Sequence, residues 1–211
     1  MDQHPDQPKL ESGLARLGLA APNGAVGQLL EYMALLREWS GAYNLVAPGE
    51  RPHLLSRHVL DSLSIAPYLG EGPLLDIGTG AGLPGLPLAI VRPGMQTWLL
   101  DSAGKKVRFV AHVARTLGLD NVHPVCARAG EELGAGDFAS ITARAFASLA
   151  DFAAAARPHC DAQTRLLAMK GGYPGEEIEA LPKRVIVEAV HTLDVPYLHA
   201  ERHLVIMTLE A

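Results

Sequence analysis

The chain of 211 residues has few aromatic side chains, only two cysteines and no long apolar run. A membrane-spanning helix needs about 20 consecutive apolar residues, and the longest apolar stretches, such as residues 83–91, are much shorter. Cys126 and Cys160 stand alone, without the paired spacing of a zinc site or a redox motif. The first residues include no basic segment followed by an apolar one, so we expect no signal peptide, no membrane partner and a cytoplasmic protein.

The sequence also lacks an excess of basic charge. Its 18 Lys and Arg against 23 Asp and Glu give a net charge of −5, which is the wrong sign for gripping phosphates. The acidic excess, however, lies in residues 1–50 and 171–211, whereas residues 51–170 carry twelve basic and ten acidic side chains. The charge therefore predicts a small positive surface on an acidic body, and it does not exclude RNA as a partner.

Apolar residues make up 48% of the chain, which suits one folded domain or one domain with an appendage. Residues 26–43 and 54–69 place apolar side chains at helical spacing. Residues 1–12 are polar and contain proline, so we expect them to fray. We predict an N-terminal helical cap over residues 1–70 and a core over residues 71–211.

Short apolar runs alternate with helical stretches throughout the core. The predicted strands are residues 73–77, 97–101, 121–126, 138–142, 164–170, 185–193 and 202–209, and the predicted helices are residues 83–91, 105–117 and 149–156. This alternation is typical of an α/β fold in which helices cover both faces of a parallel sheet. The last two strands follow each other with no strong helix between them, so we expect an antiparallel end to the sheet.

A cluster of glycines follows the first predicted strand, within residues 74–85. Glycine allows positive φ and lets a ligand lie against the backbone, and ligands of such sheets bind where the strands end. The stretch from Gly80 to Gly85 matches Gly-x-Gly-x-x-Gly, which alone is weak evidence for a dinucleotide. Because Gly78 precedes it and follows Asp76, the loop better fits the acidic-x-Gly-x-Gly-x-Gly pattern of S-adenosylmethionine (SAM) methyltransferases. Asp76 would then receive the amino end of SAM, directly or through water.

Asp101 ends the second predicted strand. A carboxylate at this position can accept hydrogen bonds from both hydroxyls of a nucleotide ribose. The alternative is a cap for the helix that begins next. The glycine cluster about 20 residues earlier favours ribose binding.

The residues of this loop and of four further blocks resemble one family, the bacterial glucose-inhibited division protein B family. The blocks occur in the family's order and span about residues 25–207. They are residues 57–62 (Arg-His-Val-Leu-Asp-Ser), 76–90, 100–109, 144–149 (Arg-Ala-Phe-Ala-Ser-Leu) and 168–171 (Ala-Met-Lys-Gly). That family methylates N7 of a guanine in the RNA of the small ribosomal subunit.

The resemblance implies a Class I SAM-dependent methyltransferase fold, Rossmann-like, with a seven-stranded, mostly parallel sheet and a helical N-terminal cap. It implies SAM contacts in the glycine loop, at the turn after the third strand and at Arg144. Together with the motif, the cofactor-binding set is Asp76, Gly78, Gly80, Gly82, Leu83, Asp101, Ala129, Gly130 and Arg144. The family commonly has an acidic residue where Gly130 stands; here Glu131 follows one position later, so only a backbone contact to adenine is retained.

The sequence lacks the residues that other methyl transfers require. Neither cysteine has the preceding proline of a pyrimidine C5 nucleophile, so we expect Cys126 and Cys160 to be buried packing residues. The Asn/Asp-Pro-Pro-aromatic loop of amine methyltransferases is also absent. Guanine N7 has an exposed lone pair and needs alignment with the methyl group more than a general base. We therefore predict that Arg144 positions the guanine or the cofactor; the alternative is a structural ion pair with Asp76, Asp101 or Asp137.

Several basic residues lie near the predicted strand ends. The predicted RNA-binding residues are Arg57, His58, Lys105, Lys106, Arg108 and Lys170. The alternatives are that the basic residues of 105–108 form only a solvated helix face, that His58 is a surface histidine, and that Lys170 is an exposed lysine at a strand end. Phe109 and Phe146 are predicted to lie in the core, and no histidine spacing indicates a metal site.

The predicted function is methyl transfer from SAM to 16S ribosomal RNA, with the free RNA, the 30S subunit or its precursor as partner. The alternatives are a small-molecule methyltransferase with an enclosed pocket, and a protein of this fold that only binds RNA or a partner. A dehydrogenase fits least, because the glycine frame is shifted and no second substrate domain is visible. No long heptad repeat is present, so we expect a monomer.

Overall fold

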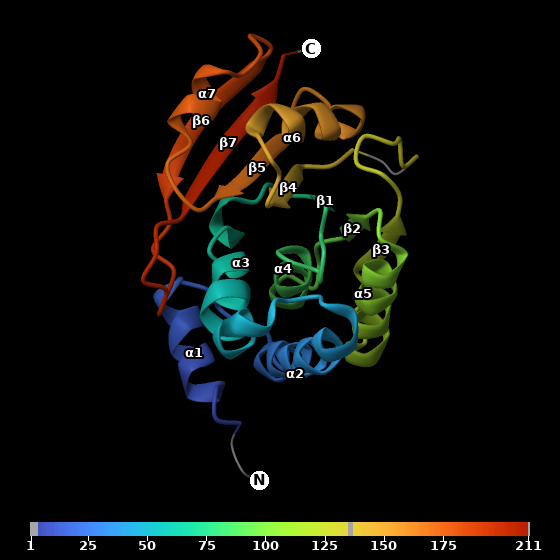
Figure 1. The fold of residues 1–211 in the computed structure, drawn as a ribbon, viewed down its shortest axis with the longest axis vertical. Helices are drawn as coiled ribbons and strands as arrows, with labels where there is room; N and C mark the ends of the chain where they lie inside the picture. The colour runs from blue at the N-terminus through green and yellow to red at the C-terminus, as the bar shows by residue number, and fades with distance from the viewer. Residues whose placement is uncertain (1–3, 135–136, 211) are drawn as a thin grey trace.

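The computed structural model describes residues 4–134 and 137–210 (Figure 1). Seven strands form one sheet in the order β3-β2-β1-β4-β5-β7-β6, with β1 to β5 parallel and β7 antiparallel to both β5 and β6. The strands are β1 (Leu74–Ile77), β2 (Thr97–Asp101), β3 (Val122–Cys126), β4 (Ser140–Arg144), β5 (Arg165–Lys170), β6 (Val185–Thr192) and β7 (His203–Leu209). The predicted parallel sheet with an antiparallel end is confirmed. The strand order reverses between β1 and β4, where α/β sheets bind their ligands.

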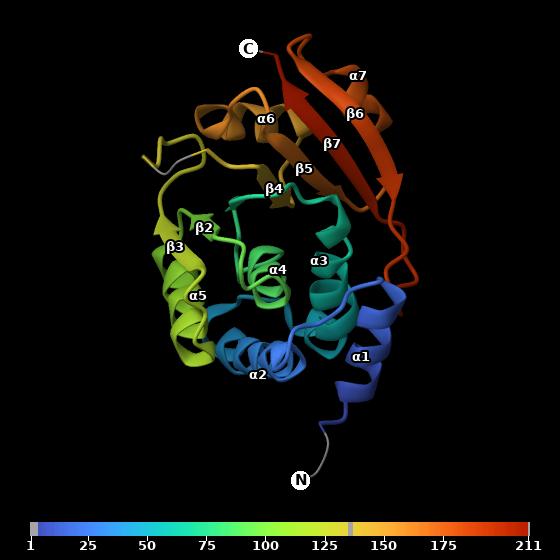
Figure 2. The same ribbon diagram turned by 180° about the vertical axis from the view of Figure 1, so that it is seen from behind.

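Helices cover both faces of the sheet, as predicted. In chain order they are α1 (Gln7–Arg16), α2 (Ala25–Tyr43), η1 (Pro48–His53), η2 (Leu54–Leu60), α3 (Asp61–Leu63), η3 (Ala66–Tyr68), α4 (Gly85–Val91), α5 (Gly104–Leu117), α6 (Leu149–Ala156), η4 (Arg157–His159) and α7 (Gly175–Glu179). In both views α2, α3, α4 and α5 gather in one part of the molecule, while α6 and α7 lie with β5, β6 and β7 (Figures 1 and 2). None of the helices in the described part of the chain is long and apolar enough to cross a membrane.

The two faces of the sheet belong to two separate apolar clusters. Leu74 and Leu99 pack with α2, α4 and α5, whereas Leu75 and Leu100 pack with α6. Successive side chains of a strand point to opposite faces, and all four of these leucines are buried. Strands buried on both faces read as continuous apolar runs, which is why the sequence predicts them well.

The N-terminal residues are ordered, so the prediction of fraying is wrong for the described part of this segment. Helix α1 buries Leu10 and Leu14. Gly13 lies so close to Leu60 that a Cβ there would be 2.7 Å from Leu60 Cδ1. The apolar side chains at helical spacing bury one face of α1 against η2, despite the polar composition around them.

The predicted helix over residues 54–69 is helical but irregular. Its first part, η2, is wound wider than an α-helix, and α3 is a short turn. The hydroxyls of Ser62 and Ser64 donate to the carbonyls of His58 and Asp61 at 2.6 Å, and such back-bonding competes with regular helical bonds. Wide turns of this kind are frequent at functional sites.

Two further details differ from the sequence predictions. The short helix α7, which follows β5, was not predicted. Cys126 is exposed, so its prediction as a buried residue is wrong: it ends β3, an edge strand with a neighbour on one side alone. Cys160 is half-buried, and its thiol donates to the carbonyl of Ala156 at 3.2 Å.

Candidate active site

The loop after β1 has the backbone that its glycines allow. Gly78, Gly80 and Gly82 have φ values of +73°, +61° and +87°, a region that other residues adopt only with strain. The N–H groups of Gly78 and Thr79 donate to the carbonyl of Leu100 at 2.8 and 3.0 Å. The loop is therefore fixed to β2 while Gly78 itself is exposed.

Gly85 is required by close packing. A Cβ at this position would overlap the side chain of Leu99 and lie 2.9 Å from Asp76 Oδ2. Its N–H donates to the same Asp76 oxygen at 2.9 Å. Glycine at the start of α4 thus lets the helix approach the sheet and reach the carboxylate.

Asp76 is completely buried and only half satisfied. Its Oδ2 accepts hydrogen bonds from Thr79 Oγ1 at 2.7 Å and from Gly85 N, whereas its Oδ1 has no partner. Burial raises the pKa of this carboxyl to about 6, although the bonds from Thr79 and Gly85 act in the opposite direction. A buried acceptor without a donor is rare in proteins. It fits the cationic amino end of SAM, or a water that bridges to it, which the sequence assigned to Asp76.

Asp101 joins the glycine loop to the start of α5. Its carboxylate accepts from Gly80 N at 3.0 Å, from Ala103 N at 2.9 Å and from Lys106 Nζ at 3.2 Å. The bond from Ala103 corresponds to the capping alternative. A carboxylate has about four acceptor positions, so these bonds leave room for one ribose hydroxyl, and ribose binding stays a prediction.

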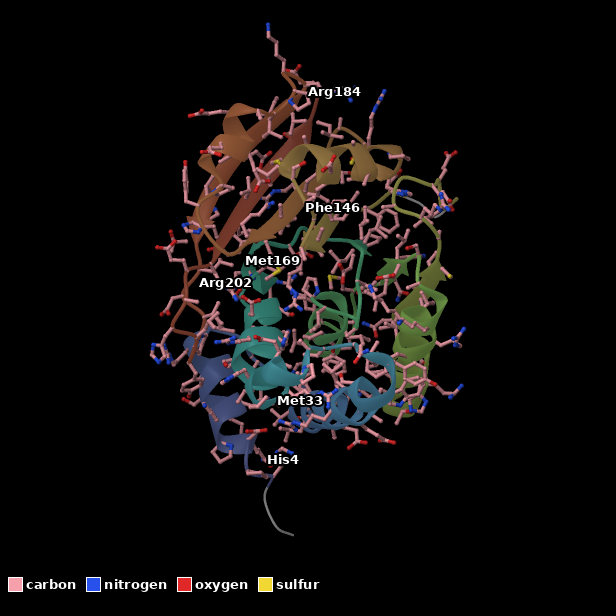
Figure 3. The ribbon with its side chains drawn as sticks, viewed as in Figure 1. His4, Met33, Phe146, Met169, Arg184 and Arg202 are labelled. Atoms are coloured by element: carbon pink, nitrogen blue, oxygen red, sulfur yellow. The ribbon has the colours of Figure 1, made fainter. Side chains whose placement is uncertain are left out.

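A cleft of about 580 Å³ opens at the carboxyl ends of β4 and β5, between the sheet and the helical cap. Its lining residues are Glu50, Arg57, His58, Asp61, Arg144, Ala145, Phe146, Met169, Lys170, Gly171, Leu198, Ala200 and Arg202. Arg202, Met169 and Phe146 lie along this boundary, whereas Arg184 lies at the opposite end of the sheet (Figure 3). A Cβ on Gly78 would be 3.7 Å from Phe146 Cε2, so the cleft borders the glycine loop.

The two phenylalanines have different environments. Phe109 is fully buried, as predicted. Phe146 is half-buried: its ring packs near Phe152, with the centroids 5.5 Å apart, and it also lines the cleft. The prediction of Phe146 as a core residue is therefore correct for only part of its surface.

Arg144 ends β4 and is held by the cap. Its guanidinium donates to His58 Nδ1 at 3.1 Å and to the carbonyl of Arg57 at 3.3 Å, and it lies 3.6 Å from Asp61 Oδ2. The ion pair is thus with Asp61 and not with Asp76, Asp101 or Asp137. About a quarter of the Arg144 side chain is exposed.

His58 is buried rather than on the surface. Burial, and then the charge of Arg144, lower the pKa of His58 to about 4, so the imidazole is neutral at pH 7. Its Nδ1 accepts from Arg144, which places the proton on Nε2, 3.7 Å from Glu50 Oε2. The histidine therefore acts as an acceptor for the arginine.

Asp61 and Arg202 belong to the same group of charges, and neither was predicted to be a site residue. Arg202 Nε donates to Asp61 Oδ1 at 2.9 Å. Burial raises the pKa of Asp61, while Arg202 and Arg144 lower it. Asp61 lies within the block of residues 57–62 that resembles the family, and this was the available signal. No sequence signal indicated Arg202, because it lies 141 residues from Asp61 in the chain.

The predicted RNA-binding residues fall into two groups. Arg57, His58 and Lys170 line the cleft, whereas Lys105 and Arg108 are exposed on α5 and Lys106 pairs with Asp101. The alternative of Lys170 as an exposed lysine at a strand end is wrong: its side chain is 13% exposed and its Nζ lies 2.7 Å from Glu177 Oε2 on α7.

The turn after β3 holds the last two predicted cofactor residues. Ala129 is exposed and Gly130 is half-buried. Gly130 has a φ of +89°, a conformation that would strain an acidic side chain at this position. The backbone contact to adenine stays a prediction.

Comparison with solved structures identifies the fold. A SAM dependent methyltransferase from Aquifex aeolicus is similar to this chain, with a TM-score of 0.56 over 75% of this chain and 94% of that chain, at 18% sequence identity. At this identity the similarity establishes the fold alone. The predicted Class I methyltransferase fold is confirmed.

Sequence comparison identifies the family. Residues 25–205 match the GidB family, described as rRNA small subunit methyltransferase G. The Ribosomal RNA small subunit methyltransferase G of Alkalilimnicola ehrlichii is 46% identical over 97% of this chain and 93% of that protein. The protein of the same name from Nitrosococcus oceani is 46% identical over 93% of this chain and 92% of that protein. Both the match and the relatives agree with the resemblance seen in the motifs, and the chain belongs to the rRNA small subunit methyltransferase G family.

Proposed function

We propose that this protein transfers a methyl group from SAM to N7 of a guanine in the 16S RNA of the small ribosomal subunit. The observation that carries the proposal is the arginine-lined cleft beside the glycine loop, in a chain of the rRNA small subunit methyltransferase G family. Phe146 brings this cleft next to Gly78, and Arg144, two residues earlier at the end of β4, lines the same cleft. Acceptor and methyl donor would therefore meet at the end of β4.

SAM supplies an electrophilic methyl group on a sulfonium, and the chain supplies the groups that hold it. We propose that the residues in contact with SAM are Asp76, Gly78, Gly80, Gly82, Leu83, Asp101, Ala129, Gly130 and Arg144. Support comes from the unpartnered Asp76 Oδ1 and from the positive φ values of the loop. Leu83 is buried and its N–H already donates to the carbonyl of Thr79, so it would contact SAM through atoms other than this N–H.

The chemistry requires positioning more than proton transfer. Guanine N7 presents a lone pair in the major groove, and correct alignment with a methyl donor can supply most of the rate acceleration. We propose Arg144 as the positioning residue for the guanine. His58 is neutral and engaged by Arg144, which agrees with a reaction that needs no general base.

The cap over residues 1–70 forms one wall of the cleft, and we propose that RNA lies between this cap and the core over residues 71–211. Glu50, Arg57, His58 and Asp61 come from the cap, whereas Arg144 comes from the core. Among the proposed RNA contacts, Arg57, Lys106 and Lys170 are paired with acids, so Lys105 and Arg108, which are exposed on α5, are the stronger candidates for phosphates. The cleft is lined by four basic and two acidic side chains, and this basic excess suits contacts to RNA phosphates.

We also propose that the protein acts as a monomer. In residues 4–134 and 137–210 the exposed large hydrophobic side chains are Tyr43, Tyr173 and Ile186, which belong to different parts of the chain. Scattered single residues do not form the contiguous apolar patch of a stable interface.

The test is methyl transfer from labelled SAM to three acceptors: 30S subunits, naked 16S RNA and a metabolite mixture. We expect label in the ribosomal RNA, in N7-methylguanine after digestion, with 30S subunits preferred over naked RNA. Binding of naked RNA should be weak and should fall steeply with salt, because it depends on phosphate contacts. Label in metabolites alone, or tight binding of NAD without binding of SAM, would contradict the proposal.

A further inference from the structure

Two arginines from distant parts of the chain meet at one buried carboxylate in the cleft. Asp61 begins α3, Arg144 ends β4, and Arg202 immediately precedes β7. Asp61 Oδ1 accepts from Arg202 Nε at 2.9 Å, and Asp61 Oδ2 lies 3.6 Å from Arg144 Nη1. The carboxylate therefore uses one oxygen for each arginine.

The burial of the three groups is uneven. The Asp61 side chain is 4% exposed, whereas the side chains of Arg144 and Arg202 are 24% and 22% exposed, and all three line the cleft. The acid thus lies beneath two guanidinium groups that reach the solvent of the cleft. Without the acid, two like charges would remain close together, and each would be free to move toward water.

Each guanidinium is also fixed by further bonds. Arg202 Nη1 donates to the carbonyl of Glu201 at 2.8 Å, and Arg144 donates to His58 and to the carbonyl of Arg57. A guanidinium carries five N–H donors in one plane. The bonds to these groups use some of the donors on each arginine, and the others remain for a ligand.

We propose that Asp61 is a positioning residue: it holds Arg144 and Arg202 as a preformed pair of donors for phosphate oxygens of the acceptor RNA. Arginine suits such oxygens because its planar fork matches them with two parallel bonds. Holding the fork in advance lowers the entropy lost when the acceptor binds. This assignment rests on the proposed function, because it makes the acceptor RNA the ligand of the pair, in addition to the proposed contact of Arg144 with SAM.

The experiment compares Asp61→Asn, Arg202→Met and the double variant with a matched control, Glu188→Gln. Glu188 also faces an arginine, Arg165, at 3.4 Å, but it lies outside the cleft. For each protein we would measure Kd for SAM, KM for 30S subunits, kcat and the thermal unfolding midpoint. All assays would run well below the lowest midpoint.

We expect Asp61→Asn to lower kcat/KM for 30S subunits by about 10- to 100-fold, the cost of misplacing a positioning group. Most of the loss should be in KM, while Kd for SAM should change much less than KM, because Arg144 is one of nine proposed contacts with SAM and Asp61 touches none of the others. The double variant should have a lower kcat/KM than Arg202→Met alone only to the extent that Asp61 also acts through Arg144. Glu188→Gln should match the wild type.

Two results would overturn the assignment while the proposed function stands. One is a wild-type kcat/KM for Asp61→Asn. The other is a parallel loss in SAM affinity, KM and thermal midpoint, which is the behaviour of a link that merely holds the cap to the core.

If Asp61→Asn does not fold, Arg202→Lys tests the same pair, because lysine keeps the charge but lacks the planar fork. A raised KM for 30S subunits with unchanged SAM affinity would support the assignment, and a wild-type KM would overturn it. The wild type is assayed first: if it binds SAM but transfers no methyl group to 30S subunits, the proposed function fails, and the assignment of Asp61 fails with it.

Discussion

Arg144 is the residue on which cap, core and cleft converge, and it provides the first prediction. Replacement of Arg144 by alanine should lower kcat/KM for 30S subunits by about 100-fold, because the guanine would lose the positioning group that we propose for it. The fold should persist, since Asp61 keeps Arg202 as a partner. Methyl transfer from labelled SAM and circular dichroism would measure the two effects.

The control for this variant is Arg165→Ala. Arg165 is also a partly exposed, ion-paired arginine at one end of a strand, but it does not line the cleft. It should retain normal turnover. Near-normal turnover of Arg144→Ala would show that Arg144 has a structural role alone.

The raised pKa of Asp76 predicts a pH dependence of cofactor binding. Below its pKa of about 6 the carboxyl is protonated and neutral, so it attracts the cationic amino end of SAM less strongly. Affinity for SAM should therefore rise as the pH increases from 5 to 7. Calorimetric titration at several pH values would measure it, with Asp76→Asn as the reference, because asparagine does not titrate. A pH-independent affinity of the wild type would contradict the assignment of Asp76.

Sequence patterns predicted the residues whose role depends on neighbours along the chain. The glycine loop and Asp76 form one local motif, and their backbone follows from it. Asp61 and Arg202 form a pair across 141 residues, and no local pattern indicates such a contact. Lys170 looked like a free cation because its partner, Glu177, belongs to a five-residue helix too short to give a periodic signal.

Strands and regular helices, α2 of the cap included, were predicted closely, whereas the irregular part of the cap was not. The bounds of β2 and α6 agree with the sequence, because continuous burial and an alanine-rich run give strong signals. Helix η2 is wound wider than an α-helix, and Ser62, just after it, bonds back to the carbonyl of His58; apolar spacing encodes neither feature. Helix α1 was missed because two buried leucines stand within a polar segment.

The start of α4 gives a prediction about an element and its packing. Gly85→Ala should destabilise the fold by about 1–3 kcal/mol, because a Cβ would overlap Leu99 and crowd the Asp76 carboxylate. SAM affinity should fall as well, since the loop would be displaced. Denaturant unfolding and SAM titration would measure the two effects.

Gly94→Ala is the matched control for this variant. A Cβ on Gly94 meets nothing within 4 Å, and its φ is not in the positive range. Its stability should stay within about 0.5 kcal/mol of the wild type. Equal stability of the two variants would show that α4 moves away from the sheet at little cost.

At the scale of the whole molecule, cap and core share one apolar cluster that extends from α1 to β7. We therefore predict that the two parts unfold in one transition. The protein has two tryptophans: Trp39 on α2, which stacks on His112 of α5 and reports on the contact between cap and core, and Trp98 on β2, which reports on the sheet. The variants Trp39→Phe and Trp98→Phe each keep one tryptophan. In each variant the denaturant midpoint measured by tryptophan fluorescence should equal the midpoint measured by circular dichroism. A lower midpoint for the Trp39 signal would mean that the cap melts alone.

One buried bond between cap and core has a thermodynamic consequence for catalysis. The hydroxyl of Tyr32 on α2 donates to the carbonyl of Ala81 in the glycine loop at 2.9 Å. A ribosomal surface that stabilises the cap would therefore also stabilise the loop conformation that receives SAM. By reciprocity, SAM would strengthen binding of the ribosomal particle by the same factor. The two substrates would thus bind cooperatively, each favouring the ternary complex, without any domain movement.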